Sequence, residues 1–144
     1  MKVYRFELSF FDEPQGVGIL QGLDETALSN RKVIRLLEPF QSKLRCPDLS
    51  DKNVNGSGVV FWFTEEGLRE FCSAIHNIIA ALDPSGWGVI MCEKDLCDGE
   101  EAFSVYSDKY QIAWLYEDIH SVPSLIPKYE PVKNVFSVAA NSIK

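Results

Sequence analysis

Glu117 and His120 follow the last predicted apolar strand of the chain, three residues apart. A carboxylate beside a histidine at the end of a strand could exchange protons with a substrate, which is general acid–base chemistry. Arg5 and Glu7 share the polar face of the first predicted strand, because they are two residues apart. We expect these four side chains to form a candidate cleft if the fold brings them together. The competing interpretation is that residues 117–120 form a loop that leaves the sheet and performs no chemistry.

Cys72 and His76 are the other pair whose types could react. They lie four residues apart within a predicted helix, so they are neighbours on its surface. A metal site requires three or four converging ligands, and the chain has 2 histidines. The spacing of Cys92 and Cys97 differs from that of a zinc knuckle. We therefore expect His76 to border the apolar face of its helix, with no metal and no cofactor bound by the chain.

Five carboxylates gather between two predicted strands, around Asp98-Gly99, a dipeptide favoured in hairpin turns. They lack the alternating oxygens, the central glycine and the later glutamate of a calcium loop. Two interpretations remain: a solvated hairpin loop, or a contact surface for a basic protein partner. Tyr129, in a C-terminal stretch with evenly spaced prolines, is the aromatic candidate for the same contact. The five carboxylates are Glu93, Asp95, Asp98, Glu100 and Glu101.

The glycines of the chain do not form a phosphate-binding motif. Gly16, Gly18 and Gly22 do not make a G-x-G-x-x-G sequence that opens a helix, and no Walker loop occurs. The sequences of a nucleophile elbow, a zinc protease helix and a C-x-x-C redox pair are also missing. A catalytic role therefore depends on the candidate cleft.

Charge and composition exclude two kinds of partner. The chain has 144 residues, the size of one domain, and its 21 acidic and 14 basic residues give a net charge of −7. The basic residues form no run, and the net field would repel phosphate and anionic lipid. We therefore expect no binding to nucleic acid and none to a membrane surface.

The compartment is inferred from the cysteines and from the beginning of the chain. No positively charged leader with an apolar segment precedes the first predicted strand, so no secretory signal is expected. No apolar run approaches the roughly 20 residues that span a bilayer. Reduced thiols in the cytoplasm are therefore the expected state of the 4 cysteines.

The elements that would position these residues centre on residues 58–82. An unbroken apolar run from Gly58 to Phe63 predicts a buried strand, and the amphipathic stretch after it predicts a helix that ends at Leu82. Thr64 suits the N-cap of that helix, and the two glutamates that follow suit the positive end of the helix dipole. The face expected to be buried contains Leu68, Phe71, Cys72, Ile75, Ile78, Ile79 and Leu82.

Shorter patterns predict the other elements. Alternating side chains predict a half-buried strand at residues 3–10, with its aromatic and leucine side chains on one face. A helix is expected at residues 27–38, ended or kinked by Pro39. The remaining expected segments are strands at 17–21, 87–92, 102–106 and 110–116, a loop at 46–57 and an edge strand at 132–138.

The order of these elements indicates an α+β fold. Hairpins at both ends of the chain favour a single mixed, mostly antiparallel sheet of five to six strands, with two helices packed on one face. Residues 1–118 are expected to form this compact domain. Residues 119–144, where the prolines recur, are expected to pack on the same domain as a C-terminal segment.

The leading functional hypothesis is a small acidic cytoplasmic protein without catalysis, which binds another protein as a regulator or inhibitor. Its candidate surfaces are the five carboxylates and Tyr129. The alternative is a small enzyme or nucleotide-binding domain that uses the candidate cleft. A third hypothesis is a homo-oligomer whose exposed edge strands pair between copies.

Overall fold

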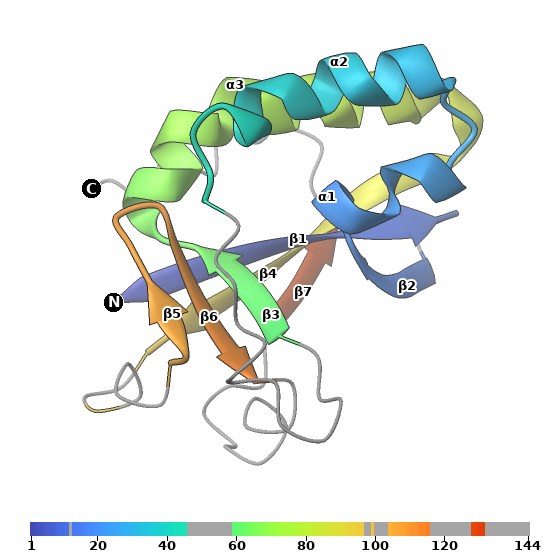
Figure 1. Ribbon diagram of the computed structural model, residues 1–144. Helices are drawn as coiled ribbons and strands as arrows, with labels where there is room; N and C mark the ends of the chain where they lie inside the picture. The colour runs from blue at the N-terminus through green and yellow to red at the C-terminus, as the bar shows by residue number, and fades with distance from the viewer. Residues whose placement is uncertain (12, 46–58, 97–98, 100–103, 116–127, 132–144) are drawn as a thin grey trace.

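One antiparallel sheet, with two long helices on one of its faces, forms the fold (Figure 1). The computed structural model describes residues 1–11, 13–45, 59–96, 99, 104–115 and 128–131. This architecture confirms the predicted α+β class and the two packed helices. The elements in chain order are β1 (Lys2–Phe10), β2 (Glu13–Gly18), α1 (Ile19–Gly22), η1 (Leu23–Glu25), α2 (Asn30–Gln41), β3 (Val59–Phe63), α3 (Glu65–Leu82), η3 (Asp83–Ser85), β4 (Trp87–Asp95), β5 (Tyr106–Ser107), β6 (Gln111–Leu115) and β7 (Lys128–Pro131).

The strands lie in the order β5-β6-β3-β1-β4-β7, and β2 also pairs with β1. Every strand pairing among the described residues is antiparallel. β1 and β4 pair along their whole lengths, from Lys2 opposite Asp95 to Phe10 opposite Trp87. With the short strands β5 and β7 included, the described part of the chain contributes seven strands to the sheet.

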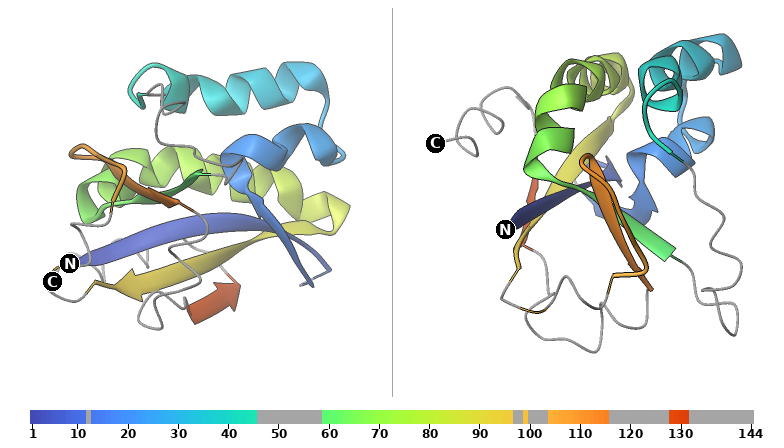
Figure 2. Two further views of the ribbon diagram at one scale, coloured as in Figure 1. Left: turned by 60° about the horizontal axis from the view of Figure 1, so that its bottom comes forward. Right: turned by 60° about the vertical axis from the view of Figure 1, so that its left-hand side comes forward.

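β1 shares its second edge between two strands. β3 pairs with β1 at one position, Tyr4 opposite Phe63, whereas β2 pairs with β1 from Glu7 opposite Gly18 onward. β3 therefore separates from β1 at Arg5. β6 pairs with β3 and diverges from β1 together with it, as the right-hand view of Figure 2 shows. We call this division of the sheet the fork.

α3 begins and ends where the sequence predicts. The Thr64 hydroxyl accepts a hydrogen bond from the Gly67 N–H at 3.1 Å and donates one to the Lys109 carbonyl at 2.6 Å, which ties the helix start to the turn before β6. The predicted apolar face is buried and packs with β1 in one core, and each large apolar side chain there contributes roughly 1.5–3 kcal/mol. Its residues include Leu68, Phe71, Cys72, Ile75, Ile78, Ile79 and Leu82.

α2 begins at Asn30 and continues past Pro39 to Gln41, so of the two outcomes expected at Pro39, an end or a kink, the helix end is wrong. Proline lacks the N–H that would bond the carbonyl of Arg35, which weakens the helix at this point. Phe40 compensates, because it is 2% exposed and stacks on Phe71 with ring centroids 5.1 Å apart. Packing against α3 therefore maintains the last turn of the helix.

The strand expected at residues 17–21 is displaced toward the N-terminus. β2 begins at Glu13, because Phe10 pairs with Glu13 and the chain turns back between them. Ile19 then begins α1, and Ile19 and Leu23 are 2% and 0% exposed in the core beneath the long helices. Burial of these two side chains explains why the chain leaves the sheet after Gly18.

Other boundaries differ by a few residues. β4 continues to Asp95, beyond the strand expected at 87–92, and β5 is limited to Tyr106–Ser107. β7 forms at Lys128–Pro131 and pairs with β4. The loop expected at 46–57 and the edge strand expected at 132–138 lie outside the described residues.

The face of the sheet away from the helices is buried as well. Val3 and Trp114 are 0% exposed and Cys92 is 1% exposed, in a second apolar cluster on that face. Arg5 and Glu7 share this face with Val3, because side chains alternate along β1. The first strand is therefore covered on both faces.

Candidate functional site

The structure brings together half of the predicted cleft. Arg5 Nε donates a hydrogen bond to Glu7 Oε2 at 2.9 Å, and the two side chains are 15% and 13% exposed. Glu117 and His120 lie outside the described residues. The pair on β1 is therefore a partly buried ion pair whose members satisfy each other.

The acidic candidates are divided by the extension of β4. Glu93 and Asp95 belong to that strand, where Glu93 is 3.2 Å from Lys2 Nζ and Asp95 is 3.7 Å from the N-terminal ammonium. Two of the five carboxylates thus have cations beside them. Tyr129 lies opposite Cys92 in the pairing of β7 with β4. The other three, Asp98, Glu100 and Glu101, lie outside the described residues.

The two described thiols are poor nucleophiles. Burial raises the pKa of Cys92 to about 12, and the nearby charge of Glu7 adds to this effect. Burial also raises the pKa of Cys72. Both thiols are therefore protonated at neutral pH, and the thiolate is the reactive form. In the part of the chain that the structure describes, no group of three or more His, Cys, Asp and Glu side chains could hold a metal.

An exposed aromatic cluster lies at the end where β1 turns into β2. It consists of Phe10, Phe11 and Trp87, and we call it the aromatic cluster. Phe10 lies opposite Trp87 in the sheet, and its ring centroid is 4.9 Å from that of Trp87 and 4.5 Å from that of Phe11. Phe10 is 38% exposed and Phe11 is 71% exposed. Adjacent aromatic rings that are exposed to solvent form an apolar surface suited to contact with another molecule.

The backbone holds Phe11 in a strained conformation. Its φ is +48°, a region that bulky side chains rarely adopt. The N–H of Phe11 donates to the Gly86 carbonyl at 3.0 Å, which fixes the turn. Gly86 has a φ of +83°, and a Cβ at this position would lie 2.9 Å from the Phe11 ring. The ring is therefore held across Gly86, and residues kept in such conformations concentrate at functional sites.

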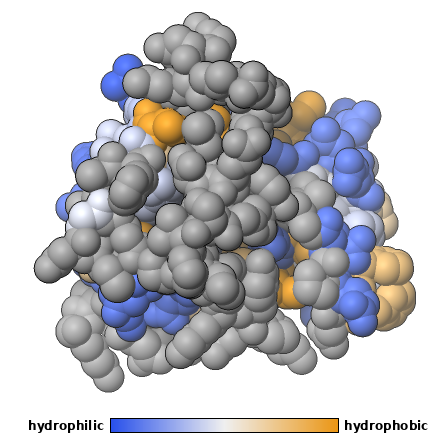
Figure 3. Space-filling model, turned by 90° about the horizontal axis from the view of Figure 1, so that it is seen from below, coloured by the Kyte–Doolittle hydropathy of each residue, from blue (hydrophilic) through white to orange (hydrophobic). Residues whose placement is uncertain are grey.

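Exposed carboxylates flank the aromatic cluster. Glu13 lies opposite Phe10 in the pairing of β1 with β2, and Asp83 begins the short η3 turn that leads to Trp87. Both residues are exposed. Figure 3 shows an apolar surface at its right-hand edge, on the side where β1 ends in Figure 1, with hydrophilic residues beside it. Two exposed carboxylates thus lie near the aromatic cluster, one across the sheet from Phe10 and one four residues before Trp87.

The sequence patterns did not indicate the aromatic cluster. Period-two alternation placed Phe10 on the buried face, and Phe11 belonged to no element. The available signal was the position of two adjacent aromatic residues immediately before a turn. Its meaning depends on Trp87, which comes beside Phe10 only when β1 pairs with β4.

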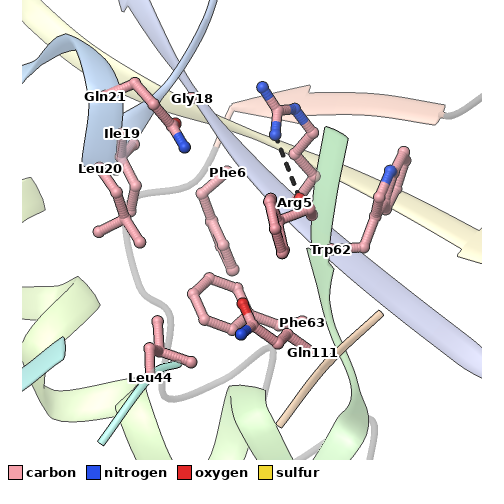
Figure 4. A pocket seen from close by; sticks show the side chains of 11 residues that line it. Arg5, Phe6, Gly18, Ile19, Leu20, Gln21, Leu44, Trp62, Phe63 and Gln111 are labelled. Carbon is pink, nitrogen blue, oxygen red and sulfur yellow. Dashed lines mark hydrogen bonds between the residues drawn. The ribbon is translucent and has the colours of Figure 1, made fainter. Parts of the chain in front are cut away.

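A groove opens at the fork, between α1, the C-terminal end of α2 and β3. Its outer part has a volume of about 320 Å³, and an inner part of about 30 Å³ reaches Arg5. Figure 4 shows the inner part, with Arg5 and Gln21 toward one end and Leu44 and Gln111 toward the other. The two parts adjoin each other, because five residues line both: Leu20, Gln21, Leu44, Phe61 and Gln111.

Arg5 bridges the fork. Its Nη1 donates a hydrogen bond to the Phe61 carbonyl at 3.1 Å, drawn as the dashed line in Figure 4. β3 no longer pairs with β1 at Phe61, because their one paired position among the described residues is Tyr4 opposite Phe63. The Arg5 guanidinium therefore supplies a hydrogen-bond donor to the Phe61 carbonyl on the side that faces β1. Arg5 therefore stabilises the open groove as well as lining it.

Comparison with known proteins adds no relative: no family model, no curated protein and no solved structure matches the chain. Function must therefore be argued from the geometry of the aromatic cluster and the groove. Among the described residues, no helix has the length and apolar character needed to cross a bilayer.

Proposed function

We propose that the chain is a non-catalytic binding protein, of the regulator or inhibitor type, which recognises a protein partner through the aromatic cluster. The observation that carries the proposal is the Phe11 ring, which is 71% exposed yet fixed on a backbone with a φ of +48°. Aromatic anchors supply much of the binding energy at protein interfaces. A ring that is already held in place loses little conformational freedom on binding, which favours affinity.

The border of the aromatic cluster defines the chemistry of the partner. Glu13 and Asp83 are exposed carboxylates, and they would pair with Lys or Arg side chains around an apolar anchor. The net charge of −7 would also steer a basic partner toward the protein. The acidic candidates at the other end of β4, together with Tyr129, belong to the same proposal as a secondary contact for a basic partner.

The alternative function, a small enzyme or nucleotide-binding domain, has narrower support. Arg5 lines the groove, which favours an anion there, but Glu7 already accepts a hydrogen bond from it. Cys72 and Cys92 are held as protonated thiols. These observations favour binding of a protein over catalysis.

The setting proposed for this activity is the cytoplasm, which the free and buried thiols of Cys72 and Cys92 support. Pairing of edge strands between copies is the competing mode of association. β5 has two residues, and the four residues of β7 end with Pro131, so these two edge strands offer few hydrogen bonds to another strand. β2 has six residues and pairs only with β1 among the described strands, so it is the edge at which two copies could pair. Binding to a different protein is the favoured proposal because it rests on the aromatic cluster and not on a strand edge.

Peptide selection on the purified chain tests the proposal directly. A displayed library is expected to yield peptides in which an aromatic or aliphatic residue is flanked by Lys or Arg. Phe11→Asn should lose these peptides, whereas Ile34→Asn should retain them, because Ile34 is 66% exposed on α2 and has no part in the aromatic cluster. Selected peptides without that pattern would contradict the proposal, as would equal binding by wild type and Phe11→Asn.

Host extracts provide the second arm of the experiment. Wild type and Ile34→Asn should both recover one stoichiometric protein partner that Phe11→Asn does not recover. A partner that all three forms recover equally would place the binding surface elsewhere.

A further inference from the structure

We propose that the groove at the fork binds a small organic monocarboxylate with an apolar body. This site is separate from the aromatic cluster and does not depend on the function proposed for it. The inference rests on the apolar lining of the groove, on the sign of its charges, and on its size and shape.

The walls of the groove would accept an apolar body. Phe40 lies at its base, and half-buried side chains from α1, α2 and β3 surround it. Partly exposed apolar side chains that converge on one cavity gain free energy when a ligand removes them from water. The apolar residues that line the outer part are Leu20, Leu37, Phe40, Leu44 and Phe61.

The charges of the groove oppose the charge of the whole protein. Arg45 lines the outer part and Arg5 lines the inner part, and the described lining residues include no Asp or Glu. The chain as a whole has a net charge of −7. Glu7 already pairs with Arg5, so among the described lining residues the guanidinium of Arg45 is the one that remains to complement an anion. Arginine matches the geometry of a carboxylate.

Arg45 is the residue that we expect to hold the carboxylate. It is exposed at the rim, and no carboxylate of the described chain forms an ion pair with it. Gln111 is 5% exposed, and its side-chain N–H donates a hydrogen bond to the Arg45 carbonyl at 2.7 Å. This hydrogen bond ties the backbone of Arg45 to Gln111, the first residue of β6, and both residues line the groove. The amides of Gln21 and Gln41 lie at the same groove and can donate further hydrogen bonds.

The dimensions favour a small molecule over a peptide. The outer volume of about 320 Å³ is at the lower end of the range for small-molecule sites. The inner part narrows to about 30 Å³ at Arg5, where the β1–β3 pairing closes the fork. A groove that is closed at one end in this way accepts one small ligand in its outer part rather than a chain that passes through.

Octanoate is a suitable probe, because it has one carboxylate and a short apolar tail. In a ¹H–¹⁵N NMR titration of the full chain, we expect saturable shifts at residues 20–21, 37–45 and 111, with a Kd of about 1 mM or tighter. Octylammonium has the same tail and the opposite charge, and it should bind about fivefold more weakly or worse.

Two arginine variants separate the local charge from the net charge. Arg45→Gln should weaken octanoate binding about fivefold, the size expected for one charged contact near the surface. Arg31→Gln removes the same charge from the opposite end of α2 and should leave the affinity within a factor of about two. Phe11→Asn should also bind octanoate like wild type, which distinguishes failure of this site from failure of the aromatic cluster.

Three results would overturn the inference. The first is an absence of saturable shifts at the groove, and the second is equal affinity for octanoate and octylammonium. The third is an equal loss of affinity in Arg45→Gln and Arg31→Gln, because net charge alone would then account for the binding.

Discussion

Replacing Phe11 with asparagine separates the stability of the fold from the binding that we propose for it. Asparagine tolerates a positive φ much better than phenylalanine, so the change relieves about 1–2 kcal/mol of backbone strain at the φ of +48°. Against this gain stands the loss of the ring contact with Phe10, whose centroid is 4.5 Å away and which is worth about 0.5–1.5 kcal/mol.

The covered part of the Phe11 ring adds a second loss. Phe11 is 71% exposed, so folding removes less than a third of its surface from water, which corresponds to about 1.5 kcal/mol. The losses together exceed the gain by about 1 kcal/mol. We therefore expect the free energy of unfolding of Phe11→Asn to fall by about 1 kcal/mol.

Binding should respond far more strongly than stability. Loss of a central aromatic anchor costs about 2 kcal/mol or more at a protein interface, which weakens the Kd by about 30-fold. Urea denaturation gives the change in stability, and isothermal titration calorimetry with a selected peptide or the captured partner gives the change in Kd.

Ile34→Asn is the matched control, because it removes an exposed apolar residue and introduces the same amide elsewhere. It should leave the Kd within a factor of about two. The reasoning is refuted if Phe11→Asn binds like wild type, if both variants weaken binding equally, or if Phe11→Asn unfolds the protein.

Three further predictions concern the sheet and its attachment to the helices. Gly67→Ala should lower the free energy of unfolding by about 2 kcal/mol in urea denaturation, because the added Cβ would lie 2.0 Å from the Tyr110 carbonyl oxygen. Helix propensity alone predicts the opposite, a gain of about 1 kcal/mol. Gln111→Leu should cost about 1–2 kcal/mol and weaken octanoate binding, since it removes the hydrogen bond to the Arg45 carbonyl; unchanged octanoate affinity would argue against a positioning role. The pKa of Cys92 is raised from 9.0 to about 12 in the folded state, so its contribution to stability is complete below pH 9 and is lost as the pH rises toward 12. Cys92→Ala should flatten this alkaline decline in a series of urea denaturations, and an unchanged slope would assign the decline to other groups.

The sequence predicts α3 and the burial of its apolar face, because an amphipathic period of 3.6 residues and a threonine cap act within one element. β1 is recognised in the same way, from its alternating side chains. These local signals are strong because each side chain reports its own burial. They are sufficient for the α+β class and for two helices on one face of the sheet.

Elements that depend on distant contacts were placed less accurately. α2 survives Pro39 because Phe40 packs on Phe71, a contact between two helices that no window of sequence contains. The start of β2 depends on a positive φ at Phe11, and phenylalanine gives no sign of that conformation. Its displacement changes Ile19 from a strand residue into the first residue of α1.

The two candidate sites were hidden for the same reason. The aromatic cluster requires β1 and β4 to be neighbours, and the groove requires β3 to leave β1 at Arg5. Neither pairing can be read from the spacing of residues along the chain. The shared face of Arg5 and Glu7 was accessible from the alternation of one strand, whereas their ion pair with each other was not predicted.

Hydrogen exchange of the protein with and without its captured partner tests the central claim most directly. We predict that the partner slows exchange in peptides that cover Phe10 and Phe11 and in those that cover Asp83 to Trp87, where the Phe11 N–H bonds the Gly86 carbonyl. Slower exchange confined to the other end of β4, near Glu93 and Asp95, with no change at Phe11, would contradict the account.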